Sequence, residues 1–447
     1  MKFTRRTFLW ITASATSVFG QDQTPAAKAD EKKPPRQWFK GNLHMHTQWS
    51  DGAPMPEWAV NWYKTHGYHF ICVSDHNGIQ TEEWTLYPQK GTTYTEEEKA
   101  ALKGENSRWK PIGKQKHFLT QAALNDTIAL FGKETIRSKK VGKRTFVRLM
   151  TFKELEKRFC EPDKFLMIPG FEQTGAAANG QNVHMNFINV RKIFPYQRGK
   201  TTLETIRKSL RMGRQIYGRM PYLFTVNHPM WKYYDISPQN LIDLPQVWLF
   251  ELTNNGIHRD YQRHPQGWQA EKFWDVVNAY RVRHSQRLLF GMGSDDRHDY
   301  AKKPRGWTIV RADRLSTAAL FDAIQKGDFY CSNGMTFRDI HFDGKALSVQ
   351  VQPPKKGKCR ILFIGTKKDY DPKSQPLDVP ASKTNPARTI DRYSDTIGVT
   401  LATVDGLEGA YTLQPDDLYV RVKIVCVQED GSIALRPCAW TQPYTAR

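Results

Sequence analysis

Five short apolar runs constrain the fold of the chain between residues 38 and about 335. They read YHFICVSDHN, KFLMIPGFEQTG, YLFTVNHPMW, VWLFELTNN and RLLFGMGSDDRH. Each has the length of a buried strand, and none shows the strict alternation of a half-exposed one. Residues 54–67 and 316–327 lie outside the runs and carry the proline, serine and glycine signals that start and stop helices. Strands alternating with helices predict an α/β fold of parallel β/α units, where function gathers at the C-terminal strand ends.

Every run ends at a histidine, an aspartate or a glutamate, and side chains of these types bind metal ions. The residues are Asp75 with His76, Glu172, His228, Glu251, and Asp296 with His298. His184 stands at the mouth of a further apolar run, NVHMNFINV. Imidazoles and carboxylates gathered at one rim are the mixture suited to zinc, manganese or iron. Chance rarely places such residues at so many strand ends, so the sequence predicts a metal centre.

Near the start of this region, GNLHMHTQWSDG places His44 and His46 two positions apart and Asp51 soon after them. In an extended strand, residues i and i+2 face the same way, about 7 Å apart. The rings of His44 and His46 are therefore able to converge on one cation. Met45, between them, should point the other way, into the packing.

The segments NLHMHTQWSDG, GYHFICVSDHN, IPGFE, NHP and GSDDRH together resemble the PHP superfamily, named for its polymerase and histidinol phosphatase members. The resemblance spans most of residues 38–300. It implies a distorted (β/α)7-type barrel, a centre of two or three divalent metal ions (zinc, manganese or iron) and hydrolytic phosphoesterase activity.

The resemblance also implies a role for each ligand. His44 and His46 would bind the first metal together with Asp296, and Glu172 would bridge two metals. The second metal would be completed by His184 and His228, and the third by Asp51, His76 and His298. Asp295 is an alternative to Asp296, which the spacing favours.

Closely spaced cations lower the pKa of a shared water, so a metal-bridging hydroxide would attack the substrate without a separate general base. Three residues are predicted to act in catalysis: Glu172; Asp75, which would orient its neighbouring ligand or a water; and Arg297. Arg297 and Arg305 are the candidates for gripping an anionic substrate. Glu251 and Asn254 either line the pocket or have a structural role.

The N-terminus carries the features of an export signal. Residues 1–20 have a basic start and a short apolar run, and TRRTFL resembles a twin-arginine signal. We therefore expect export to the periplasm or the extracellular space, a polar linker at residues 21–37, and no transmembrane segment after signal removal.

Changes in the sequence pattern along the chain predict an insertion in the first domain and a separate C-terminal domain. Residues 38–335 are predicted to form the metal-dependent hydrolase domain, with an insertion at about 80–150 that is either a lid or a decoration and is helical around TQAALNDTIALFG. Residues 336–447 alternate as antiparallel strands do, with a hairpin turn at Asp430-Gly431, and predict a small β-sandwich. Of the cysteines, Cys72 is predicted to be a core thiol, and Cys426 and Cys438 could bridge.

The net charge of +21 favours an anionic ester substrate, either a small molecule or a polymer, although a generic basic surface explains the charge equally well. Nucleic acid is not an expected partner, and the sequence does not predict the oligomeric state.

Three functions remain open at this point. The first is an exported metal-dependent phosphoesterase. The second is a hydrolase of carbamates or other non-phosphate esters with the same site. The third is a non-catalytic polyanion-binding protein with structural metals, although a closed tetrahedral cage would need far fewer ligands.

Overall fold

The computed structural model describes residues 35–80, 93–102, 108–114, 118–231, 235–254, 270–300, 303–381 and 387–446. The predicted signal peptide and residues 21–34 of the predicted linker lie outside these residues. Among the described helices, none combines the length and the apolar character needed to cross a membrane.

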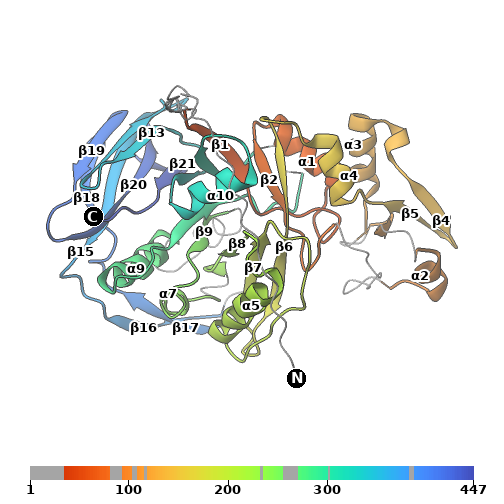
Figure 1. Cartoon of the computed structure of the whole chain (residues 1–447), viewed down its shortest axis with the longest axis horizontal. Helices are drawn as coiled ribbons and strands as arrows, with labels where there is room; N and C mark the ends of the chain where they lie inside the picture. The colour runs from red at the N-terminus through yellow and green to blue at the C-terminus, as the bar shows by residue number, and fades with distance from the viewer. Residues whose placement is uncertain are drawn as a thin grey trace, which may run out of the picture. The chain divides into compact units, whose positions relative to one another are not determined.

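Seven strands of one large mixed sheet carry the apolar runs and the segment that precedes the histidine pair (Figure 1). They are β1 (Gln37–Asn42), β2 (Phe70–Val73), β6 (Leu166–Ala176), β7 (Asn182–Ile188), β8 (Leu223–Val226), β9 (Leu249–Thr253) and β10 (Phe290–Gly293). Every residue of β2, β8, β9 and β10 is buried, as the continuous apolar runs predict. The mixed α/β class is therefore confirmed.

Before residue 335 the strand directions of the large sheet depart from a purely parallel arrangement at two places: at β7, and at residues 307–312, which pair antiparallel both with β1 and with residues 329–332. Parallel pairing joins β1 to β2 and β2 to β6, and also β8 to β9 and β9 to β10. Strand β7 runs antiparallel to both of its neighbours, β6 and β8. The expectation of parallel units throughout is wrong here, because a tight turn closed by Ala177 N–H donating to Gln181 O joins β6 directly to β7 without a helix.

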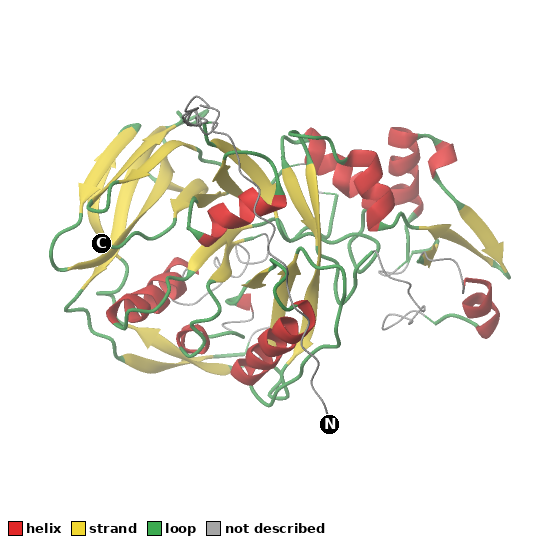
Figure 2. Cartoon of the chain, in the orientation of Figure 1, coloured by secondary structure: helices red, strands yellow, loops and turns green. Residues whose placement is uncertain are grey.

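Helices pack on this sheet (Figure 2). They include α1 (Pro56–Thr65), α5 (Thr202–Tyr217), α7 (Pro238–Ile242), α9 (Ala270–Arg283) and α10 (Thr317–Gln325). The two helices predicted from the sequence are α1, which has proline at its first position, and α10, which is capped by the Ser316 side chain. In Figure 1, α5 lies outside β7; α9 contacts β9, and α10 contacts β11 (Trp307–Ala312).

The predicted insertion has its own small three-stranded sheet, ordered β3-β5-β4. Its elements are α2 (Glu96–Leu102), β3 (Trp109–Pro111), α3 (Gln121–Phe131), the 3-10 turn η1 (Lys133–Thr135), β4 (Ser138–Val141) and β5 (Arg144–Arg148), followed by α4 (Phe152–Phe159). Helix α3 confirms the prediction of helix at TQAALNDTIALFG.

After residue 335 all strand pairings of the described residues are antiparallel. The strands are β13 (Phe337–Phe342), β14 (Ala346–Val351), β15 (Lys358–Lys367), β16 (Ser374–Val379), β17 (Arg388–Tyr393), β18 (Val399–Asp405), β19 (Glu408–Thr412), β20 (Asp417–Val427) and β21 (Ile433–Thr441). The predicted hairpin joins β20 to β21, and Gly431 in its turn has φ +81°. Strand β21 also pairs with β12 (Phe329–Ser332), so the large sheet continues across residue 335. The division into two domains stays a prediction.

The cysteines lie in the packing. Cys72 is fully buried in β2, as predicted for a core thiol. No disulfide joins Cys426 to Cys438, and the two residues belong to different hydrophobic clusters. Cys438 stands opposite Val425, the neighbour of Cys426, and successive residues of a strand face opposite sides. The suggested bridge between Cys426 and Cys438 is therefore absent.

A buried ion cluster joins α9 to β20. The guanidinium of Arg421, which is 1% exposed, donates to both carboxylate oxygens of Asp275, at 2.9 and 2.6 Å, and to Glu271 at 3.2 Å. Lys423 and Tyr419 complete the cluster by donating to Glu271 and Asp275. Because buried charges are costly unless paired, each member depends on the others.

We expect Arg421→Met to lower the free energy of unfolding by about 3–5 kcal/mol, because the buried carboxylate of Asp275 then loses the guanidinium that donates to both of its oxygens. The matched control is Arg360→Met on the adjacent strand β15, since Arg360 pairs with Asp405 at an exposed position and should cost no more than about 1 kcal/mol. Urea unfolding measures both. Equal losses in the two variants would contradict this account.

Candidate metal centre

Nine side chains predicted to bind metals come together in the structure. Their nitrogen and carboxylate atoms form three overlapping groups: His44, His46 and Glu172; Glu172, His184 and His228; and His46, Asp51, His76 and His298. Within each group the atoms that face a common point lie within 4.8 Å of one another. Asp296 joins the first group, with Oδ1 at 3.3 Å from His44 Nε2 and 3.1 Å from His46 Nε2.

The strand directions explain this convergence. His44, His76, His228 and Asp296 follow the C-terminal ends of the parallel strands β1, β2, β8 and β10, which meet at one edge of the sheet. His184 comes from antiparallel β7, but it lies near the start of that strand and pairs with Thr174 near the end of β6. The reversed strand therefore brings its first residues to the same edge.

Glu172 occupies the middle of the centre, and its side chain is fully buried. Five imidazoles surround its carboxylate at 2.6–3.8 Å; they belong to His44, His46, His76, His184 and His228. Asn227 and Thr174 donate hydrogen bonds to its two oxygens, both at 2.7 Å. A carboxylate shared by two of the three groups has the placement of a bridging ligand.

Glu251, for which the sequence left two roles open, fixes the orientation of His44. Its Oε1 accepts from His44 Nδ1 at 2.6 Å, so His44 Nε2 is left to face the centre. Three further donors hold the same carboxylate: Ser294 Oγ at 2.5 Å, and the His228 N–H and Asn254 Nδ2, both at 2.9 Å. This carboxylate–imidazole pairing is the usual partner arrangement of a metal-binding histidine.

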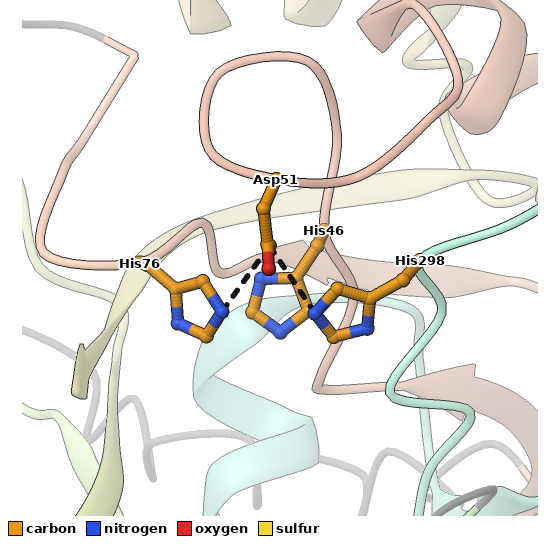
Figure 3. A group of neighbouring side chains, drawn as sticks. All are labelled: His46, Asp51, His76 and His298. Atoms are coloured by element: carbon orange, nitrogen blue, oxygen red, sulfur yellow. Dashed lines mark ion pairs between the residues drawn. The ribbon is translucent and has the colours of Figure 1, made fainter. Parts of the chain in front are cut away.

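The third group is the most open part of the centre. Figure 3 shows Asp51, His76 and His298 pointing toward one another beside His46. Asp51 Oδ1 lies 3.2 Å from both His76 Nε2 and His298 Nε2. The side chains of Asp51, His76 and His298 are 22, 23 and 36% exposed, whereas His44 and Glu172 are fully buried. The centre is therefore reached by solvent from the side of this group.

The imidazoles and carboxylates of the centre shift one another's pKa values. Burial opposes charge on Glu172, but the imidazoles of His44 and His76 hold the pKa of its carboxyl well below the usual range. Burial, His298 and His76 lower the pKa of His46 to about 3. Against burial, Glu172 and Asp51 raise the pKa of His76 to about 10. Protonated imidazoles such as that of His76 thus stabilise the charge of the buried carboxylates.

Backbone strain is concentrated at the same place. His228 and Asp296 have φ values of +25° and +43°, in a region that residues other than glycine rarely adopt. Such strain persists where surrounding structure enforces it, and it clusters at functional sites. Both residues are predicted ligands that come two or three residues after the end of a strand, and this backbone conformation accompanies the turn of their side chains into the centre.

Asp75 lies beneath the loop that carries Asp51 and belongs to none of the three groups. Its carboxylate accepts from the Thr47 N–H at 2.8 Å, Thr47 Oγ1 at 2.9 Å, Ser50 Oγ at 2.5 Å and Gln80 Nε2 at 2.6 Å. Burial raises its pKa, and these hydrogen bonds act in the opposite direction. Asp75 thus holds the loop that carries Asp51. Its predicted role, to orient the neighbouring ligand or a water, stays a prediction.

Arg297 points away from the centre. Its side chain is 1% exposed, and its guanidinium lies 3.5 Å from the ring centroid of Trp62. Asp296 and His298 face the ligand groups, so the intervening residue turns to the opposite side. A guanidinium enclosed in this way does not reach a bound substrate, and the structure gives no support to the predicted catalytic role of Arg297. Arg305 pairs with Asp299 at 3.0 Å.

Two further predictions from the sequence concern the side chain of Met45 and the choice between Asp295 and Asp296. Met45 is fully buried in a hydrophobic cluster with Val60 and Ile71, as predicted. Asp295 accepts from the backbone N–H groups of Arg305 and Gly306, which leaves Asp296 as the acid at the centre.

Two residues beside the centre escaped the sequence analysis. Thr174 donates to Glu172, and its Oγ1 lies 2.6 Å from His76 Nδ1. Thr174 comes two residues after Glu172 on one strand, so its side chain faces the same way, and this spacing could have identified it from the sequence. The Trp231 ring lies 5.2 and 5.3 Å from the rings of His184 and His228. No local pattern distinguished Trp231 from the other tryptophans.

The donor set fits divalent cations. His46 Nδ1 is buried and has no hydrogen-bond partner among the described residues. The Nε2 atoms of His44 and His46 lie 3.0 Å apart, a distance at which two imidazoles need a shared proton or cation. Mixed imidazole and carboxylate ligands suit zinc, manganese and iron.

No family model and no curated protein matches the chain. Among solved structures, it is similar to a two-domain protein containing a predicted PHP-like metal-dependent phosphoesterase from Bacteroides vulgatus, with 12% identity, a TM-score of 0.37, and coverage of 94% of this chain and 99% of the other. It is also similar to a candidate metal-dependent phosphoesterase from Bifidobacterium adolescentis, with 13% identity, a TM-score of 0.27, and coverage of 61 and 91%.

We expect Glu251→Gln to weaken divalent metal binding by about ten- to hundredfold, because an amide holds the His44 Nδ1 proton less strongly than a carboxylate does. Metal titration of the purified variant measures the change. The matched control is Glu57→Gln, since Glu57 is equally buried and contacts no member of the three groups. Unaltered affinity in Glu251→Gln would show that Glu251 does not position His44.

Proposed function

We propose that the chain is a metal-dependent hydrolase of the PHP type that cleaves phosphoesters with two or three divalent cations. One observation carries the proposal: nine imidazole and carboxylate side chains from segments far apart in the sequence converge on one centre around Glu172. A purely structural site closes with four ligands, so a centre of this size points to chemistry.

The three groups assign the chain's residues to the ions. His44, His46, Asp296 and Glu172 would hold one ion, and Glu172, His184 and His228 a second. Asp51, His76 and His298 would hold a third with His46. Zinc, manganese and iron all suit these donors.

The bound ions would lower the pKa of a water and neutralise charge on the attacked oxygens. The protein residues supply geometry. Glu251 holds the His44 ring, and Asn227 with Thr174 fixes both oxygens of Glu172. Asp75 holds the loop of Asp51. The partly exposed third group leaves one side of the centre open to an anionic ester.

The finer fold assignment belongs to the same proposal. Residues 38–335 would form a distorted (β/α)7-type barrel, and residues 336–447 a β-sandwich. The second assignment is supported by one hydrophobic cluster that contains Ile340 and Val349 from the sheet of β13 and β14, and Ile361 and Val422 from β15 and β20.

Metal analysis and a panel of chromogenic substrates test the function. We expect more than one divalent ion per chain, and turnover of phosphomonoesters or phosphodiesters that a chelator abolishes and added metal restores. His76→Ala should reduce turnover by more than the roughly ten- to hundredfold loss seen when only a ligand's hydrogen-bond partner is removed. His341→Ala, outside the three groups, is the control.

The panel also separates the alternatives. Preference for a carbamate or carboxyl ester would move the assignment to a non-phosphate hydrolase. Metal-loaded protein that turns over no substrate would favour the polyanion-binding protein, and a metal-free wild type would refute the proposal.

We also propose that residues 1–20 direct export through the twin-arginine route to the periplasm or beyond. Replacing Arg5 and Arg6 with lysine should retain a C-terminally tagged protein in the cytoplasm, because the route reads the arginine pair. The control replaces Lys32 and Lys33 of the linker with arginine. Cell fractionation measures both, and cytoplasmic retention of the unaltered chain would count against export.

A further inference from the structure

The loop of residues 47–52 carries Asp51, the only carboxylate of the third group. Turn hydrogen bonds shape this loop, since the N–H groups of Ser50 and Gly52 both donate to Thr47 O at 3.0 Å. These bonds are local and do not attach the loop to the rest of the protein. Asp75 holds the loop from the β2 side.

The insertion holds the same loop from its other side. Lys110, in β3 of the insertion, is 2% exposed and donates from Nζ to the carbonyl of Ser50 at 2.8 Å. Ser50 immediately precedes Asp51. A buried lysine that reaches a backbone carbonyl next to a ligand is unusual, because burying this side chain is costly without a specific partner.

Trp49 forms a second attachment. Its Nε1 donates to the carbonyl of Met150 at 2.7 Å, just after β5. Its ring belongs to a hydrophobic cluster otherwise built largely from the insertion, through Leu119, Leu124 and Val147. Trp49 is 3% exposed, so its side chain attaches the loop to the insertion and does not line an open pocket.

Two neighbouring residues of the loop are thus bound to the insertion, and the next residue is Asp51. The first two groups contain no residue of this loop. We infer that the insertion of residues 80–150 positions Asp51 through Lys110 and Trp49, and so controls occupation of the third cation site separately from the other two. This inference rests on the proposed metal centre and gives the insertion a role that the sequence left undecided between lid and decoration.

Lys110→Met tests the inference, because it keeps the length of the side chain and removes the donor to Ser50. Hydrogen exchange of the metal-free protein, read by mass spectrometry on peptides covering residues 47–52, should become faster. Titration with Mn²⁺ or Zn²⁺ should show one ion bound at least about tenfold more weakly, with the other binding steps unchanged. Lys140→Met, at an exposed position of β4 in the same small sheet, is the matched control.

Trp49→Phe is the second variant, since it keeps an aromatic ring in the cluster and removes the Nε1 donor to Met150 together with part of the ring volume. It should shift exchange and metal binding in the same direction, by less. Exchange and ion binding that match wild type in both variants would overturn the inference and leave the proposed function standing. Faster exchange with all ions bound as tightly as in wild type would also overturn it. A wild type that binds no divalent ion would instead show that the proposed function itself has failed.

Discussion

The buried carboxylate of Glu172 is the interaction on which the centre depends. A charge fully removed from water must be compensated nearby, and here the imidazoles of His44 and His76, within 3.2 Å of the carboxylate, supply much of the compensation. Protonated imidazoles and metal ions are alternative sources of the same positive charge. In the proposed function, bound cations would replace these protons, and metal affinity would be linked to pH through that exchange.

The sheet supplies the geometry that one carboxylate cannot provide alone. Parallel strands deliver His44, His76 and His228 to one edge, and the reversed strand β7 delivers His184 from its first residues. A strand of the other direction is compatible with the centre because the turn between β6 and β7 lies at the same edge. The direction of a strand matters less than which of its ends reaches the ligands.

Contacts behind the ligands hold them in place. Glu251 orients a ring, Asp75 holds a loop from the segment after β2, and Lys110 holds that loop from the insertion. Farther away, Arg421 ties α9 to the C-terminal strands through a buried ion cluster. Each of these groups is buried and paired, so its loss leaves a buried charge, donor or acceptor without its partner.

Residue type and spacing, read from the sequence alone, determined the buried strands, helices α1 and α10, and the nine side chains that meet, because continuous apolar runs and capping are properties of neighbouring residues. Their roles as ligands remain predictions. Only the tertiary structure decided the direction of β7, the contact between Lys110 of the insertion and the loop that carries Asp51, and the enclosure of Arg297 against Trp62. These features depend on which distant residues come into contact, and no local pattern specifies that pairing.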